Sequence, residues 1–198
     1  MDYVSQTRRN IRVRRTWLLF TALIAMGLTL PSCRSVEWFV VKRSLRNKFR
    51  DEHWITTRQL ADWLADKQLP APILLDVRTS AEWKVSHLPG ARRVEPGASA
   101  AVAAGDIGRD VPIVTYCAVG YRSGEMAQRL RKAGYTNVQN LEGSIFEWAN
   151  EHRPLVHDGR LASQVHPYDA SRGRLLSDDV RAPLPPNEAP NDSELRSR

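Results

Sequence analysis

Cysteine is scarce in this chain, with only two among 198 residues. That number excludes a disulfide-rich scaffold and a zinc site built on four cysteines. The composition is otherwise near the globular average, with 42% apolar and 26% charged residues, which argues against collagen, a coiled coil or wholesale disorder. The length suits one ordinary domain with flanking segments.

A basic excess is also missing from most of the chain, although the net charge is +7. Residues 1–50 hold eleven Lys or Arg against two acidic residues, whereas residues 51–198 hold 18 against 20. Because the part that can form a globular domain is close to neutral, we expect no nucleic-acid partner. The positive charge belongs to an N-terminal arm around an apolar segment.

The uncharged run from residue 16 to residue 33 directly follows Arg14 and Arg15. A basic start, an apolar stretch and small residues at the exit are the layout of an export signal. The residues before Cys33 resemble a bacterial lipobox, which makes Cys33 a candidate lipidation site. The same run is close to the length of about 17–25 residues that spans a bilayer. We therefore expect a membrane-associated protein of the bacterial cell envelope, with its domain facing the periplasm. Three alternatives stay open for the N-terminal segment: a lipid anchor, a transmembrane helix and a cleaved signal.

Changes in composition divide the chain into four segments. We predict a signal or anchor segment at 1–33, a basic linker at 34–50, a globular domain at 51–155 and a disordered tail at 156–198. The mixed apolar and basic stretch is also compatible with a helix on anionic headgroups or with a helix that leads into the domain. The tail has a single aromatic residue and four prolines after residue 182, so we expect it to bury too little apolar surface to become ordered. No internal repeat is visible.

Short strands alternate with helical patterns between residues 57 and 151. The apolar runs 73–77 and 111–116 are typical of strands buried on both faces. A further strand is predicted at 137–141, and another around Val94. Helical patterns occupy 58–67, after Thr57 as the expected N-cap, and 80–86, 98–104, 124–133 and 144–151. This alternation predicts an α/β domain with a mainly parallel sheet.

The chemistry centres on Cys117, which follows a predicted buried strand and precedes a short loop and a helix. Ligands of open α/β sheets bind outside the carboxyl ends of the strands. The partial positive charge of a helix N-terminus stabilises a thiolate, Arg122 adds a fixed cation, and Gly120 lets successive N–H groups face one anion. We interpret this as a nucleophile in an anion cradle, suited to a sulfur or phosphorus centre. A buried inert cysteine is the alternative.

Four segments, in this order, resemble the rhodanese domain over about residues 51–155. They are Leu75-Asp76-Val77-Arg78 with Glu82-Trp83, then His87-Leu88-Pro89-Gly90-Ala91, then Cys117 to Ser123, and last Leu141-Glu142-Gly143 with Trp148 and Pro154. The resemblance implies a central five-stranded, mainly parallel sheet with helices on both faces. It also implies a sulfurtransferase without metal or cofactor, whose cysteine takes up sulfane sulfur as a persulfide and passes it to a thiophilic acceptor.

Site residues follow from the same resemblance. Cys117 is the implied nucleophile and persulfide carrier, and Arg122 would bind a small anionic donor such as thiosulfate. Asp76 and Arg78 are expected to support the loop as a structural ion pair, and His87 to stabilise a turn. Acceptors would be cyanide, a thiol or a protein thiol. The N–H groups expected to form the cradle are those of Ala118, Val119, Gly120, Tyr121, Arg122 and Ser123.

Two other functions are weighed against sulfur transfer. Four residues separate Cys117 from Arg122, whereas the related phosphatases have five, so a phosphatase or arsenate reductase is disfavoured. A sulfur-carrier or protein-binding module without turnover stays open. Its support is the apolar rim formed by Ala118, Val119 and Tyr121, which would suit a protein partner.

Overall fold

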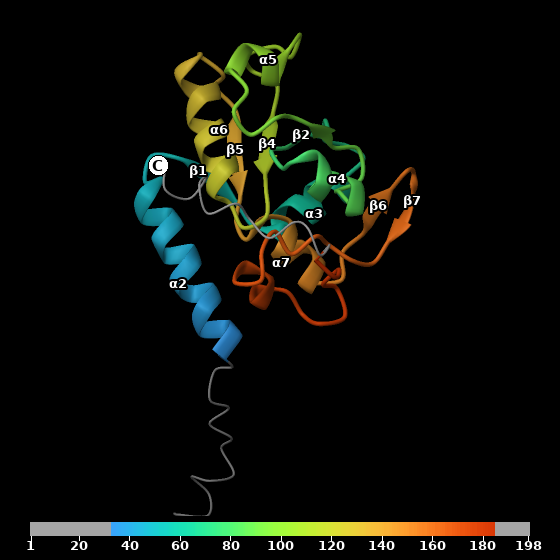
Figure 1. Cartoon of the computed structure of the whole chain (residues 1–198). Helices are drawn as coiled ribbons and strands as arrows, with labels where there is room; N and C mark the ends of the chain where they lie inside the picture. The colour runs from blue at the N-terminus through green and yellow to red at the C-terminus, as the bar shows by residue number, and fades with distance from the viewer. Residues whose placement is uncertain (1–32, 185–198) are drawn as a thin grey trace, which may run out of the picture. The chain divides into compact units, whose positions relative to one another are not determined.

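The computed structural model describes residues 33–184, and residues 34–184 belong to one compact unit (Figure 1). The predicted export signal or anchor lies outside the described residues, apart from its last residue, Cys33. None of the helices within residues 33–184 has the length and hydropathy needed to cross a bilayer. The anchor prediction is therefore untested by the described part of the chain.

A single sheet of five parallel strands forms the centre of the domain. The spatial order is β1-β5-β4-β2-β3, so β4 lies in the middle. This confirms the predicted sheet and adds β1, which the sequence analysis missed. The strands are β1 (His53–Ile55), β2 (Ile73–Asp76), β3 (Arg92–Arg93), β4 (Ile113–Tyr116) and β5 (Val138–Leu141).

Helices connect the strands, and three of them begin at a residue whose side chain accepts from a free backbone N–H. Two of them start with capping boxes, in which the side chain of Thr56 or Thr79 accepts from the backbone three residues on. Thr56 is thus the cap, rather than Thr57 as predicted. The helices are α3 (Thr57–Ala65), α4 (Ser80–Val85), α5 (Ala100–Ala104), α6 (Tyr121–Lys132) and α7 (Ser144–Asn150).

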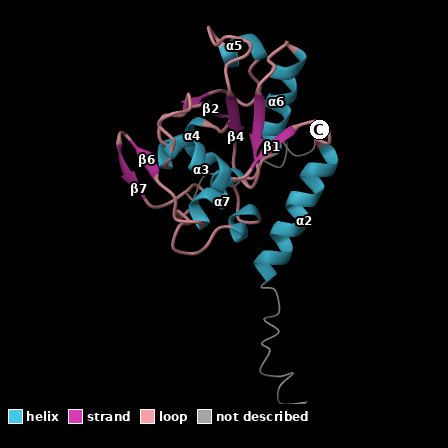
Figure 2. Ribbon diagram, turned by 180° about the vertical axis from the view of Figure 1, so that it is seen from behind, coloured by secondary structure: helices cyan, strands magenta, loops and turns pink. Residues whose placement is uncertain are grey.

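Two hydrophobic clusters lie on the two faces of the sheet. Figures 1 and 2 show the strands of this sheet and the helices around it. Successive side chains of a strand point to opposite faces, so Leu74 belongs to one cluster and Leu75 to the other. Residues of α3 and α7 complete the first cluster, and residues of α5 and α6 complete the second. The predicted helices on both faces are confirmed.

The segment predicted as a basic linker at 34–50 is instead mostly a helix, α2 (Cys33–Lys48), that packs on the domain. Leu45 and Phe49 are four residues apart, so they lie on the same side and both are buried. A Cβ on Gly124 of α6 would lie 2.8 Å from the Phe49 ring, so glycine is needed for this close approach. A plain linker is therefore wrong, and the alternative of a helix that leads into the domain is the one observed, because these two apolar residues bury against the domain.

The prediction of a disordered tail from residue 156 is wrong as far as residue 184. Strands β6 (Leu155–His157) and β7 (Arg160–Ala162) form an antiparallel hairpin, and a 3₁₀ turn, η1 (Arg172–Leu175), follows. We call residues 163–182 the C-terminal segment. Its sparse apolar residues make no core of their own; they insert into the cluster of α3 and α7. These inserted residues are Val165, Leu175, Leu176 and Val180.

Leu176→Ala should lower the free energy of unfolding by about 2–5 kcal/mol, because it leaves a cavity at a site only 1% exposed. Chemical denaturation of the full chain measures this. The matched control is Leu161→Ala, at a site 85% exposed, where we expect a change of less than about 0.5 kcal/mol. Equal effects of the two substitutions would contradict an ordered C-terminal segment.

Candidate active site

Cys117 lies directly after β4, at the carboxyl edge of the sheet, and only 1% of it is exposed. Its backbone is held by the start of α7. The Cys117 N–H donates to the Ser144 hydroxyl at 3.2 Å, and the Ile145 N–H donates to the Cys117 carbonyl at 3.2 Å. The neighbouring helix therefore fixes the position of the cysteine where the chain leaves the strand.

Hydrogen-bond donors surround the Cys117 sulfur. The Gly120 N–H donates to it at 3.2 Å, and the Ser123 hydroxyl lies 3.5 Å away. Burial acts to raise the pKa of the thiol, but the Arg122 charge and the bonds from Ser123 and Gly120 outweigh it and hold the pKa below its ordinary value. The site thus favours an anionic sulfur.

Gly120 makes the turn between the cysteine and α6. Its φ of 118° is left-handed, and an added Cβ would lie 3.4 Å from Leu45 of α2. Its carbonyl accepts from the Asn140 side chain of β5 at 2.9 Å. The backbone freedom predicted for Gly120 is therefore used, and the turn is supported from two neighbouring elements.

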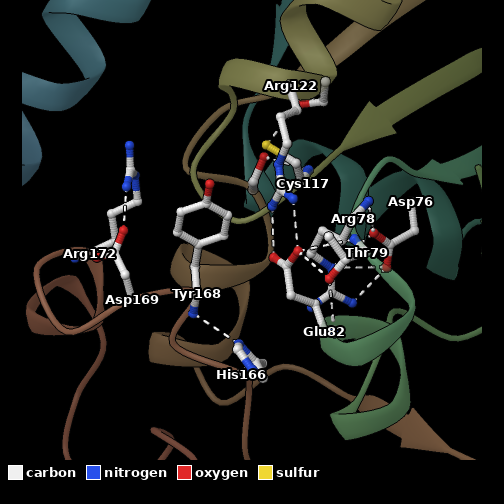
Figure 3. Close-up of polar contacts among 12 residues, drawn as sticks. Asp76, Arg78, Thr79, Glu82, Cys117, Arg122, His166, Tyr168, Asp169 and Arg172 are labelled. Atoms are coloured by element: carbon white, nitrogen blue, oxygen red, sulfur yellow. Dashed lines mark hydrogen bonds and ion pairs between the residues drawn. The ribbon is translucent and has the colours of Figure 1, made fainter. Parts of the chain in front are cut away.

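Arg122 is in the first turn of α6, and its two terminal nitrogens donate to the two carboxylate oxygens of Glu82, each at 2.7 Å (Figure 3). Glu82 is 2% exposed, and it also accepts from the Thr79 N–H at 3.0 Å. Burial acts to raise the pKa of Glu82, but the arginines Arg122 and Arg78 bring it below its usual value. The observed partner of Arg122 is Glu82, and its role toward a donor stays a prediction.

Asp76 and Arg78 form a completely buried ion pair beside this site (Figure 3). The Arg78 guanidinium donates to both Asp76 oxygens and, at 2.6 Å, to the Ser86 carbonyl. Arg78 thereby ties β2 to the end of α4, the helix that carries Glu82. This matches the structural ion pair that was expected. His87, expected to stabilise a turn, stacks on Trp83 with ring centroids 3.5 Å apart.

The apolar rim of the loop, expected to suit a protein partner, is covered by the chain itself. Ala118 and Val119 are buried, 3% and 8% exposed, in a cluster that also holds residues of α2 and the C-terminal segment. Tyr121 packs edge-on against Phe49 at 5.8 Å, and its hydroxyl accepts from Lys48. Two of the three rim residues, Ala118 and Val119, are therefore part of the core, whereas Tyr121 is partly exposed.

Tyr168 of the C-terminal segment also reaches the site, which the sequence analysis missed. Its ring centroid lies 4.8 Å from the Arg122 guanidinium and 4.7 Å from that of Arg172. Figure 3 shows the ring between the two arginines. The capping pattern of Thr79 and Glu82 was readable in the sequence, but no local pattern connects Tyr168 with a loop more than forty residues earlier.

A family model described as the rhodanese-like domain matches residues 56–151. A protein named sulfurtransferase from Allochromatium vinosum is 33% identical over 102 residues, which are 52% of this chain and 92% of that protein. The chain belongs to the rhodanese-like family. The matched region contains Cys117 and Arg122 and ends before the C-terminal segment.

Other rhodanese-like relatives are matched over smaller parts of their length. The probable adenylyltransferase/sulfurtransferase MoeZ of Mycobacterium tuberculosis is 34% identical over 101 residues, half of this chain and 25% of that protein. A tRNA uridine(34) hydroxylase of Erwinia tasmaniensis is 30% identical over 118 residues, 57% of this chain and 34% of that protein. A crystal structure of the Alr3790 protein from Anabaena sp. has a TM-score of 0.48 at 23% identity, covering 52% of this chain and 80% of that one.

The rate of Cys117 alkylation should stay high at pH values below about 8.5, the ordinary pKa of a free cysteine, because the site lowers the pKa of the Cys117 thiol. Arg122→Gln removes the main charge that lowers this pKa, so the midpoint of the rate–pH profile should move upward. Iodoacetamide labelling of the full chain measures the profile when the peptide containing Cys117 is followed by mass spectrometry.

Two further variants control this experiment. Arg131→Gln removes an arginine of the same helix that pairs with Glu52 at 3.6 Å, and it should leave the profile unchanged. Because Arg122→Gln leaves Glu82 buried without its partner, the double variant with Glu82→Gln is measured beside it. An identical midpoint in the wild type and both Arg122 variants would refute the electrostatic role of Arg122.

Proposed function

We propose that this protein is a sulfurtransferase in which Cys117 carries sulfane sulfur as a persulfide. The observation that carries the proposal is the environment of the Cys117 sulfur, where two hydrogen-bond donors and the Arg122 charge favour the anionic form. A thiolate is the nucleophile that sulfur transfer requires, and a persulfide is likewise an anion at its outer sulfur. Membership of a family with sulfurtransferase-named relatives supports the same reaction class.

The proposed reaction has two steps that balance. The Cys117 thiolate attacks the outer sulfur of thiosulfate, the S–S bond of the donor breaks, and sulfite leaves with the electron pair. A thiophilic acceptor such as cyanide then attacks the outer sulfur of the persulfide. Thiocyanate forms and the Cys117 thiolate returns. No external oxidant or reductant is needed, because the sulfur atom is transferred as S(0), first from thiosulfate to Cys117 and then from Cys117 to cyanide.

The surroundings of Arg122 favour this reaction over phosphate chemistry. Both terminal nitrogens of the arginine are bonded to Glu82, so its planar fork is occupied by a carboxylate. The arginine then acts on the sulfur through its charge. That arrangement suits a persulfide, in which one negatively charged sulfur has to be stabilised. A phosphoryl group would need hydrogen-bond donors for three oxygens, and the terminal nitrogens of Arg122 are already bonded to Glu82.

Incubation of the full chain with thiosulfate should add the mass of one sulfur atom, and cyanide should remove it. Intact-mass spectrometry measures both changes, and peptide mapping assigns the added sulfur to Cys117. Cys117→Ser should show neither change. Because the chain has a second cysteine, Cys33→Ser serves as the matched control and should behave like the wild type.

The outcomes separate the candidate functions. Repeated thiocyanate release supports an enzyme, whereas a single stoichiometric persulfide without turnover supports a sulfur-carrier module. Activity that persists in Cys117→Ser would overturn the assignment of the nucleophile.

We also propose that the protein is attached to a membrane through its N-terminal region. The support is the uncharged run from residue 16 to residue 33 with arginines before it. Directly after it, α2 exposes apolar side chains, with Val36 49%, Phe39 64% and Val40 58% exposed. Such residues beside an apolar run suit the interface of a bilayer.

Expressed in a bacterium, the full chain should sediment with membranes and resist extraction by alkaline carbonate. Ile24→Arg places a charge within the uncharged run and should release the protein, because a central arginine costs about 2.5–3.5 kcal/mol on insertion. Cys33→Ser should release it only if a lipid on Cys33 is the anchor. Wild-type protein found in the soluble fraction would refute membrane attachment.

A further inference from the structure

We propose that the C-terminal segment, through Tyr168, makes the active site selective for small donors and small thiophilic acceptors and excludes thiols carried by large partners. The inference rests on the proposed function for the substrate class, since it concerns what can reach the Cys117 sulfur. The family match ends at residue 151, so Tyr168 belongs to the part of the chain outside the matched domain.

The C-terminal segment is an ordered loop closed at its base. The Val165 N–H donates to the Val180 carbonyl at 2.8 Å, and the Ala182 N–H donates to the Val165 carbonyl at 3.0 Å. Further along, the Leu175 carbonyl accepts from Trp38 of α2 at 3.1 Å and from Asn150 of α7 at 2.8 Å. The segment is thus joined to two helices that also pack against the cluster around Ala118 and Val119.

The backbone of Tyr168 is in an unfavourable conformation that its surroundings maintain. Its φ is 67°, in the left-handed region that non-glycine residues rarely adopt. The Tyr168 N–H donates to the ring of the buried His166 at 3.0 Å. On the other side, Asp169 is 6% exposed and accepts from the Arg172 N–H at 2.6 Å. Strain of this kind is often found where a side chain is held for function.

The resulting stack places the Tyr168 ring beside Arg122, the residue whose charge acts on Cys117. Tyr168 lies between Arg172 and Arg122, and Arg122 acts on the Cys117 thiolate by its charge (Figure 3). Each arginine is paired with a carboxylate, Glu82 or Asp169, so the stack has little net charge to attract a substrate. We therefore assign Tyr168 a positioning and size-limiting role.

Because Cys117 is buried, the Tyr168 ring can limit which reagents reach its sulfur. Cys117 is 1% exposed, and the neighbouring Ala118 and Val119 are buried in a cluster that also holds residues of α2 and the C-terminal segment. A thiol on a folded protein is surrounded by other residues, which would meet this closely packed surface and the Tyr168 ring before the thiol reached the sulfur. Thiosulfate, cyanide and low-molecular-weight thiols need only a narrow approach to the sulfur.

The test compares a small and a bulky thiol reagent on the full chain. Iodoacetamide and fluorescein maleimide are applied separately, and the peptide containing Cys117 is followed by mass spectrometry. Tyr168→Ala should raise the rate with the maleimide about tenfold, while the rate with iodoacetamide changes less than about twofold. Tyr168→Phe should retain the wild-type ratio, because the ring and its contacts with the arginines are kept.

Tyr135→Ala is the matched control. Tyr135 follows the opposite end of α6 and its ring contacts Arg109 at 5.3 Å, so the substitution removes the same side chain and the same kind of contact away from Cys117. It should leave the reagent ratio unchanged. Circular dichroism of every variant confirms that the chain is folded.

Sulfur acceptors provide the second measurement. After loading with thiosulfate, the wild type should pass sulfur to cyanide much faster than to the thiol of reduced serum albumin. Tyr168→Ala should raise the albumin rate about tenfold. An unchanged reagent ratio in folded Tyr168→Ala would overturn the size limit even if Cys117 forms a persulfide. A changed ratio without any persulfide would retain the size limit and overturn only the proposed sulfur transfer.

Discussion

The buried Glu82 carboxylate is the contact on which the candidate site depends. It closes the capping box of α4 through Thr79 and accepts both terminal nitrogens of Arg122 from α6. A buried charge is tolerated only when it is paired, and loss of one partner typically costs about 3–5 kcal/mol. The pair therefore fixes the distance between two helices and, with it, the place of the Arg122 charge beside Cys117.

That constraint explains why the arginine and the cysteine have separate tasks. The Glu82 carboxylate accepts hydrogen bonds from both terminal nitrogens of Arg122. The positive charge of Arg122, together with the Gly120 N–H and the Ser123 hydroxyl, still holds the pKa of the Cys117 thiol below its ordinary value. Burial alone would raise that pKa. The site thus combines a buried cysteine with a stabilised thiolate, a combination that suits sulfur transfer.

The flanking segments change what the rhodanese-like domain can contact. In this chain α2 and the C-terminal segment contribute residues to the cluster that contains Ala118 and Val119, and Tyr168 adds an aromatic ring beside Arg122. The size limit proposed for Tyr168 therefore depends on a residue outside the region that the family model covers.

The sequence by itself determined the parallel sheet, most of the helices and the position of Cys117 before a Gly- and Arg-bearing loop, because these depend on local patterns and short spacings. It did not reveal the packing of residues 156–184 or of α2, whose few apolar residues count only when a distant surface receives them. The contact of Tyr168 with Arg122 is of the same kind. Tertiary structure decided it, because the Tyr168 ring reaches Arg122 only when the leucines and valines of the C-terminal segment insert into the distant cluster of α3 and α7.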